Sequence, residues 1–358
     1  MSLRNCDIVF NNQDKTYYPG QTVKGIVNFS FNFPKEIRGI SIKFEGEATT
    51  KWTKRNGGNR RRRPRYFTAT EEFFKFQYYL LGSQTGDRIE IPAGTHSYSF
   101  SCVLPSTLPA SFEGKFGHIR YTVKITLDIP WESNQENETA FIIISTIDLN
   151  LNPQVKTPID VSFRKNFGST CLGCCEAGSI TMIGSLPYTG YVSGQEIPLS
   201  LEIDNNSDVE FESIHVELKK KILFHSQRPS RRTKKLVETV WELIIQLNDG
   251  FMNSNTICTP IAIPALPPSL EHCSIIDLDY EIKVYVNFKG IRGGAYIKIP
   301  IIIGTIPLTS SQLGATAIGF MVNSTESSAP PETLNSDITL DPDAPPPPYC
   351  SLYPNMRT

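Results

Sequence analysis

The stretch LPASFEGKFGHIRYTVKITLD, Leu108 to Asp128, decides the fold. In its second half, from Tyr121 onward, apolar side chains alternate with polar ones, which is the period of a strand that buries one face. The proline and glycines of its first half are typical of turns. The stretch therefore predicts a tight connection that leads into a long, half-buried strand.

The same alternation recurs through the first 300 or so residues. Examples are VNFSFN, ISIKFE and YSFSC in the first half, and IPLSLEI, IHVEL and YEIKVYV in the second. VETVWELIIQL comes nearest to a helical pattern, but its β-branched and aromatic content leaves a strand at least as probable on composition. Many short strands separated by Gly, Pro and Asn turns predict an all-β fold made of antiparallel sandwiches.

Two landmarks occur twice, in the same order. YYPGQTVKGIVNFSF resembles GYVSGQEIPLSLEI, with Gly20-Gln21 matching Gly194-Gln195. LPASF followed by YTVKITL resembles LPPSL followed by YEIKVYV. An internal repeat of this length predicts two related sandwiches in tandem.

We expect four segments along the chain. The first sandwich covers residues 1–150, a linker covers 151–169 with the interruption NLNPQVKTP at its start, and the second sandwich covers 170–306. Residues 307–358 are rich in Ser, Thr, Asn and Pro and lack the apolar content to fold alone. They predict a disordered, Pro-rich tail.

The composition and the N-terminal sequence limit the compartments and the classes of partner that we expect for the protein. A net charge of −1 gives no global attraction to nucleic acid, which we therefore do not expect as a partner. The N-terminal residues lack the apolar core of a signal peptide, and the most apolar windows are too short to cross a bilayer. We expect a cytoplasmic protein whose 8 cysteines are reduced.

No pattern in the sequence predicts catalysis. The 5 histidines are scattered without metal-ligand spacing, and no nucleophile elbow, P-loop or dinucleotide-binding glycine pattern is present. We expect a protein that is not an enzyme and uses no cofactor.

One cysteine cluster, Cys171, Cys174 and Cys175, leaves three interpretations open. The thiols could be small buried hydrophobic groups, three of the four ligands of a zinc site, or acylation sites that add membrane affinity.

Two basic runs follow the matched strands ISIKFE and IHVELKK, so they occupy the same topological place in each repeat. The cations that we single out are Lys54, Arg55, Arg60, Arg61, Arg62 and Arg63 in the first run, and Arg231, Arg232, Lys234 and Lys235 in the second. Each run predicts a long connection between neighbouring strands. The connections are either solvated loops or contacts to an anionic membrane surface or an acidic cargo tail.

The tail contains APPPPYC, in which Pro346, Pro347 and Tyr349 fit the P-P-x-Y ligand of WW domains. Prolines pre-set a polyproline II helix whose flat faces pack between aromatic rings at little entropic cost, and the tyrosine fills the next pocket. A second tyrosine segment, SLYPN with Tyr353, lacks the preceding prolines. The alternative is a Pro-rich spacer that happens to contain Tyr.

Together, the tandem sandwiches and the motifs YYPGQTVKGIV, IPAGTHSYSFSCVLP and LPASFEGKFGHIRYTVKITLD resemble the arrestin fold, and within it the α-arrestins, or arrestin-domain-containing proteins. The resemblance runs from about Cys6 to Gly304. The sequence shows no amphipathic helix in its first half and no clear clathrin-binding box, which favours the α branch over the receptor-desensitising one.

The resemblance implies an adaptor. Its tail would recruit HECT-type E3 ubiquitin ligases through their WW domains, and its sandwiches would engage cytoplasmic parts of membrane receptors or transporters. We then expect roles in ubiquitination, endocytosis and endosomal protein transport, at the plasma membrane and endosomes. The alternatives are a structural scaffold of endosomal coats, like the arrestin-fold subunit of retromer, and a thioredoxin-binding redox regulator, for which neither Cys258 nor Cys273 can be assigned from sequence.

Overall fold

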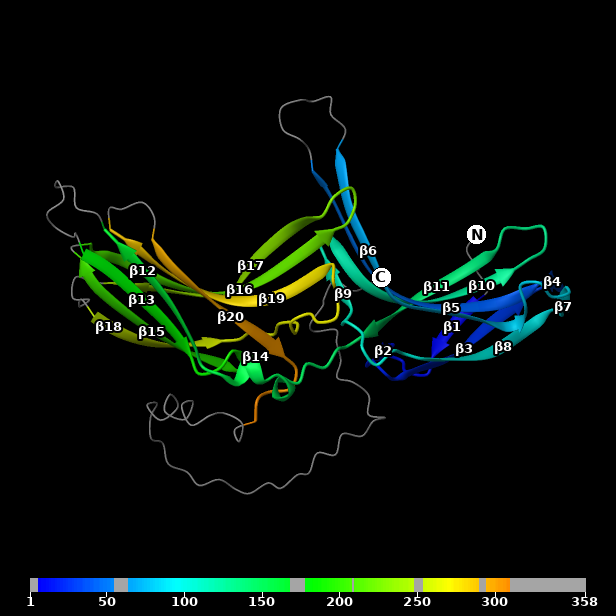
Figure 1. The fold of residues 1–358 in the computed structure, drawn as a ribbon. Helices are drawn as coiled ribbons and strands as arrows, with labels where there is room; N and C mark the ends of the chain where they lie inside the picture. The colour runs from blue at the N-terminus through cyan, green and yellow to red at the C-terminus, as the bar shows by residue number, and fades with distance from the viewer. Residues whose placement is uncertain are drawn as a thin grey trace, which may run out of the picture.

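Two β-sandwiches lie side by side in the structure, a computed structural model (Figure 1). It describes residues 6–54, 64–167, 178–207, 209–247, 254–289 and 294–309. Strands dominate these residues, and the helical elements among them are two short 3-10 turns, η1 (Leu149–Leu151) and η2 (Pro153–Lys156). Among the helices of the described residues, none has the length and hydropathy needed to span a bilayer. The predicted all-β class with two tandem sandwiches is confirmed.

The first sandwich faces a three-stranded sheet against a larger one. The small sheet has the order β1-β3-β8, and the large one has the path β2-β11-β10-β5-β6 with β9 pairing β10; β4 and β7 form a separate two-stranded ribbon. The bounds are β1 Cys6–Phe10, β2 Thr16–Tyr17, β3 Thr22–Phe31, β4 Lys35–Ile37, β5 Gly39–Lys54, β6 Arg65–Gly82, β7 Ile89–Ile91, β8 Gly94–Val103, β9 Phe112–Gly114, β10 Gly117–Asp128 and β11 Gln135–Ile143.

The second sandwich repeats this plan. One sheet has the order β12-β13-β15-β18 and the other β14-β20-β19-β16-β17. The bounds are β12 Ile159–Asn166, β13 Gly178–Leu186, β14 Gly190–Val192, β15 Glu196–Ser207, β16 Phe211–Ser226, β17 Arg232–Gln246, β18 Ser254–Ala262, β19 Ile276–Phe288 and β20 Ala295–Gly304. The ambiguous stretch VETVWELIIQL is therefore strand, and most of it lies in β17.

The repeated LPxS…Y landmark forms the same hydrogen bonds in both sandwiches. The hydroxyl of Tyr121 donates to the carbonyl of Pro109, and that of Tyr280 donates to the carbonyl of Pro267, each at 2.6 Å. Similarly, Ser111 Oγ accepts from Ile143 N at 2.9 Å and Ser269 Oγ accepts from Ile303 N at 3.1 Å. A buried tyrosine hydroxyl needs a hydrogen-bond partner. In each sandwich the proline carbonyl of the LPxS connection provides it, and the bond holds that connection against the central strand. The sequence repeat is thus a structural repeat.

The Gly-Gln landmark also forms the same kind of turn in both sandwiches. Gly20 and Gly194 have φ values of +82° and +87°, a left-handed conformation that favours glycine. In each turn the following glutamine folds back, so that Gln21 Oε1 accepts from Tyr18 N at 2.9 Å and Gln195 Oε1 accepts from Val192 N at 3.0 Å.

The alternating apolar residues form the core, as expected for strands with one buried face. Tyr121, Val123, Ile125 and Leu127 of β10 are fully buried. The matching residues of β19 are likewise buried. Because both central strands carry the Tyr-x-Val/Ile-x-Ile/Val pattern, each core is organised around the same element.

The connection between the sandwiches is shorter than the linker expected at 151–169. β12, at Ile159–Asn166, pairs with β13 in antiparallel register from Ile159↔Leu186 to Asn166↔Ser179, so it belongs to a sheet of the second sandwich. Its apolar residues Ile159, Val161 and Phe163 alternate with exposed residues but are only half-buried. The expected linker extends over this strand because the strand follows directly on the prolines and asparagines of NLNPQVKTP. A small cluster of Ile147, Leu149 and Val155 fixes the connection.

Candidate functional site

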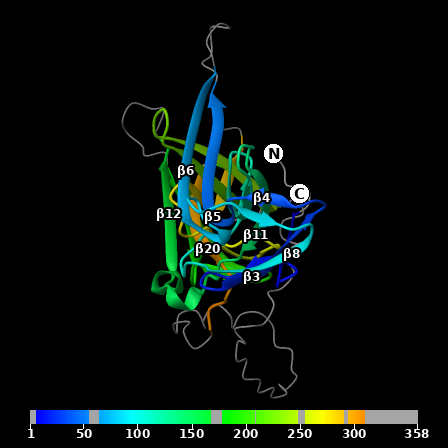
Figure 2. The ribbon, with the colours of Figure 1, turned by 90° about the vertical axis from the view of Figure 1, so that its right-hand side faces the viewer.

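The two predicted basic connections arise from hairpins that meet between the sandwiches. β5 and β6 stand out from the first sandwich, and the β16–β17 hairpin reaches toward them (Figures 1 and 2). Thr68 of β6 joins the second hairpin through backbone bonds: its N–H donates to Arg228 O at 2.9 Å, and its carbonyl accepts from the N–H groups of Gln227 and Arg228, both at 3.0 Å. These bonds close a short antiparallel bridge between the two repeats.

Polar side chains add to this bridge. Thr50 Oγ1 of β5 donates to His225 O at 2.6 Å. The carboxylate of Glu71 accepts from Ser274 N at 2.8 Å, from Ser274 Oγ at 2.9 Å and from Cys273 Sγ at 3.6 Å. The contacts to Ser274 and Cys273 tie β6 to the segment that precedes β19.

An aromatic contact lies beside the polar one. Phe224 of β16 is fully buried. It packs edge-on against Phe116, with ring centroids 5.7 Å apart, and in a tilted arrangement against Phe112, with centroids 6.3 Å apart. Lys234 Nζ lies 5.2 Å from the centroid of the same Phe116 ring. The β9–β10 turn of the first sandwich, which belongs to the stretch that decides the fold, thus docks on the second sandwich.

We call the cations around this contact the basic junction. Its members are Lys51, Lys54, Arg65, Lys115, Arg228, Arg231, Arg232, Lys234 and Lys235, and each is exposed. Within the described ranges, no carboxylate lies at ion-pair distance from any of them. Unpaired like charges that converge raise the local positive potential, so the junction attracts anions although the chain is nearly neutral.

A cavity of about 640 Å³ lies in the second sandwich, on its side of the basic junction. Its lining includes Arg231, Arg232, Thr233, Ser274 and His225. The imidazole of His225 is held on both sides, with Nε2 2.7 Å from Asp277 Oδ2 and Nδ1 3.0 Å from Thr233 Oγ1. Two arginines in the lining of one hollow match the chemistry of carboxylate and phosphate recognition.

Five of the cations predicted from sequence fall in the described residues, and the structure brings all five to the basic junction: Lys54, Arg231, Arg232, Lys234 and Lys235. The other predicted site residues lie outside the described residues: Arg55, Arg60, Arg61, Arg62, Arg63, Cys171, Cys174, Cys175, Pro346, Pro347 and Tyr349. Sequence reasoning missed Thr68, Glu71 and Ser274, because nothing local in the sequence marks them as contacts between repeats.

The two cysteines considered for a redox role differ in environment. Cys273 is half-buried at the junction; burial first, and then Glu71, raise the pKa of its thiol to about 12, although backbone hydrogen bonds oppose the rise. Cys258 is exposed on β18. Since the thiolate is the reactive form, Cys273 is a poor nucleophile. Among the described residues there is no group of three His, Cys, Asp or Glu side chains placed to hold a metal ion.

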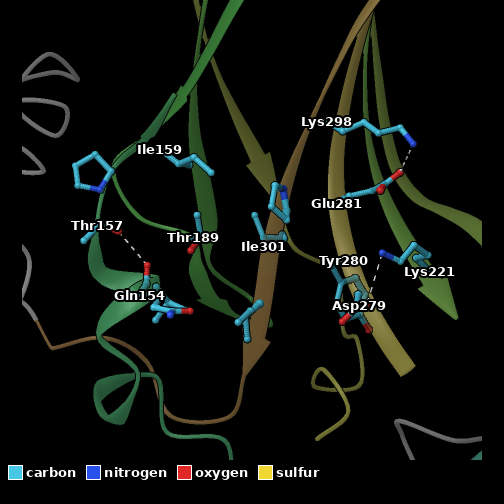
Figure 3. Close-up of a pocket in the computed structure, with 14 residues that line it drawn as sticks. Gln154, Thr157, Ile159, Thr189, Lys221, Asp279, Tyr280, Glu281, Lys298 and Ile301 are labelled. Carbon is cyan, nitrogen blue, oxygen red and sulfur yellow. Dashed lines mark hydrogen bonds and ion pairs between the residues drawn. The ribbon is translucent and has the colours of Figure 1, made fainter. Parts of the chain in front are cut away.

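A second hollow, of about 510 Å³, lies where the connection meets β19 and β20 (Figure 3). Its charged residues are paired: Lys221 with Asp279 at 3.5 Å and Lys298 with Glu281 at 3.3 Å. Because each cation there is neutralised, this hollow offers no comparable attraction to an anion.

The fold and its repeats define a class of protein, and comparison with known proteins agrees with it. The family described as "Arrestin (or S-antigen), N-terminal domain" matches residues 6–150, and "Arrestin (or S-antigen), C-terminal domain" matches residues 176–308. Together the two matches cover most of the chain and every named strand of the two sandwiches except β12, which lies between them.

Curated relatives carry matching names. The chain is similar to arrestin domain-containing protein 17 of Caenorhabditis elegans, at 28% identity over 331 residues, 87% of this chain and 73% of that protein. It is similar to arrestin domain-containing protein 4 of Mus musculus, at 27% over 321 residues, 85% of this chain and 72% of that protein. It is also similar to mouse arrestin domain-containing protein 1, at 26% over 299 residues, 83% of this chain and 63% of that protein.

The chain therefore belongs to the arrestin family, as an arrestin-domain-containing protein of the α-arrestin type. Membership of this family points to a non-enzymatic adaptor fold.

Proposed function

We propose that the protein links membrane-protein cargo to WW-domain HECT-type E3 ubiquitin ligases, and so promotes ubiquitination, endocytosis and endosomal protein transport. The observation that carries the proposal is the proline run ending in Tyr349, which follows two complete sandwiches and matches the spacing that WW domains bind. An adaptor acting on membrane proteins would work at the cytoplasmic face of the plasma membrane and of endosomes.

The sandwiches contribute the other half of the adaptor. The basic junction supports this role because it concentrates exposed cations, without ion-pair partners in the described residues, at the place where the two repeats meet. Such a surface favours the acidic cytoplasmic segments of receptors or transporters, or an anionic leaflet, by charge complementarity. A single P-P-x-Y motif buries little area and binds weakly, so engagement of cargo or membrane by the junction would raise the effective concentration of the ligase.

A pull-down with quantitative mass spectrometry tests the proposal. We expect the full chain to capture HECT-type ligases, and a chain lacking residues 341–358 to lose them while keeping cargo proteins. Stable capture of endosomal coat subunits by both chains, without ligases, would contradict the proposal and favour the coat-scaffold alternative.

A further inference from the structure

β17 is an edge strand that begins at the basic junction. It is 15 residues long and pairs with β16 on one side. In the part of the chain that the structure describes, no strand pairs with its other side. An edge strand directs N–H and C=O groups away from its neighbour, and these groups can receive an added strand.

The first part of β17 offers an unbroken edge. From Arg232 to Thr239 its residues pair one by one with Ser226 to Lys219 of β16, and the register shifts only beyond that point, where Val240 is the extra residue of a bulge. Bulges twist an edge and end regular pairing, so an added strand fits this run and not the whole of β17. Every residue of the run except the half-buried Leu236 is exposed.

Charge decides what can bind there. Arg232 and Lys235 have no carboxylate partner among the described residues, whereas the one acidic residue of the run, Glu238, is neutralised by Lys220 at 2.8 Å. Lysine on an edge commonly blocks pairing with other chains. The same cations favour an acidic strand, because opposite charges across neighbouring strands stabilise the pair and like charges destabilise it.

The cavity beside Arg232, at the start of the run, indicates in which direction a partner strand would run along β17. Arg231 and Arg232 line this cavity with Thr233 and Ser274, and guanidinium groups bind carboxylates in a forked geometry. The sheet is antiparallel from β20 through β19 and β16 to β17. A strand added in the same sense runs from Thr239 toward Arg232, so its carboxyl-terminal half reaches the cavity.

We propose that the Arg232–Thr239 edge of β17 binds an extended segment of a partner protein by antiparallel strand addition. The segment is apolar or β-branched in its first half, opposite Val237, and acidic in its second half, opposite Lys235, Arg232 and Arg231. This inference rests on the proposed role in cargo recruitment and states how the cargo segment is held.

A designed peptide tests the inference on the full chain. The probe is a fluorescein-labelled peptide as long as the Arg232–Thr239 run, with alternating Val and Thr in its first half and Asp and Glu in its second. One comparison peptide carries lysine in place of the acids, and another has alternate backbone amides methylated, which removes the donors that strand pairing needs. We expect the unmodified acidic probe to bind at least about tenfold tighter than either comparison peptide.

Two further measurements locate the binding. Hydrogen exchange should slow in residues 232–239 when the acidic probe is added. The double variant Arg232→Glu with Lys235→Glu should lower the affinity about tenfold or more, whereas Lys24→Glu, the same charge reversal at an exposed position of β3, should leave it unchanged.

Several outcomes would overturn the inference. The lysine or methylated peptide could bind as tightly as the acidic probe, or binding could leave exchange at residues 232–239 unchanged. The amides of this run that point away from β16 could already exchange slowly in the free chain. If that protection were independent of concentration, it would identify a segment of the same chain as the occupant, and if it depended on concentration, a second copy. Capture of ligases by the tail is read separately, so failure of the probe to bind with ligase capture intact removes only this inference.

Discussion

At the scale of single residues, Cys273 and Cys258 show how environment separates two identical side chains. Burial raises the pKa of the Cys273 thiol to about 12, so at pH 8 almost none of it is thiolate, and its Sγ is turned toward Glu71. Cys258 is exposed on β18. Cys273 is therefore poorly suited to a redox role that needs a reactive thiol.

We predict that iodoacetamide at pH 8 modifies Cys258 and leaves Cys273 unmodified in the folded protein, as read by peptide mass spectrometry. The thiolate is the attacking form, so a raised pKa and burial both slow the reaction. Reactivity of Cys273 should increase as the pH approaches about 12. In urea both cysteines should react alike, and equal rates in the folded protein would contradict the described environment of Cys273.

At the scale of elements, one aromatic ring packs at the centre of the apolar contact between the sandwiches, beside the backbone bridge and the polar contacts. Phe224 of β16 contacts Phe116 in the β9–β10 turn and Phe112 of β9. The packing at the turn is tight, since a Cβ added at Gly114 would lie 2.7 Å from the Phe112 ring and 3.0 Å from the Phe224 ring. The Phe224 ring thus packs the β9–β10 turn, which lies in the stretch Leu108 to Asp128, against the β16–β17 hairpin, which carries the second basic run.

We predict that Phe224→Ala destabilises the protein by about 3–5 kcal/mol, the usual cost of removing a buried phenylalanine. Hydrogen exchange in Phe112–Gly114 and Gly117–Asp128 of the first sandwich should accelerate although the substitution is in the second. Leu223→Ala, the adjacent half-buried residue of the same strand, serves as the control and should leave the first sandwich unaffected. Unchanged exchange in Phe224→Ala would show that the ring does not couple the sandwiches.

These elements also show how far sequence reasoning reaches. The alternation around Tyr121 and Tyr280 predicted both central strands, because a half-buried strand leaves a period of two in the sequence. The expected linker includes β12, because this short strand follows directly on the prolines and asparagines of NLNPQVKTP. The bridge of Thr68 to Gln227 and Arg228 uses backbone groups that every residue has, so no side-chain pattern could reveal it. Only the equivalent placement of the two basic runs indicated that the two hairpins correspond.

At the scale of the whole molecule, the two repeats meet through equivalent hairpins. This arrangement gathers cations from both sandwiches at one surface, although the net charge of the chain is −1. The tail motif is far along the chain from this surface and uses different chemistry, prolines and a tyrosine rather than charge. An adaptor needs two such independent binding functions, one for the cargo and one for the ligase.

The central claim is that the tail recruits WW-domain ligases, and calorimetric titration of the full chain with the WW domains of a HECT-type ligase tests it most directly. We predict measurable binding that Tyr349→Ala abolishes and that Tyr353→Ala, a change at the tyrosine lacking the proline pair, leaves intact. Circular dichroism should be the same for both variants and the unmodified chain. Undiminished WW binding by Tyr349→Ala would contradict the account.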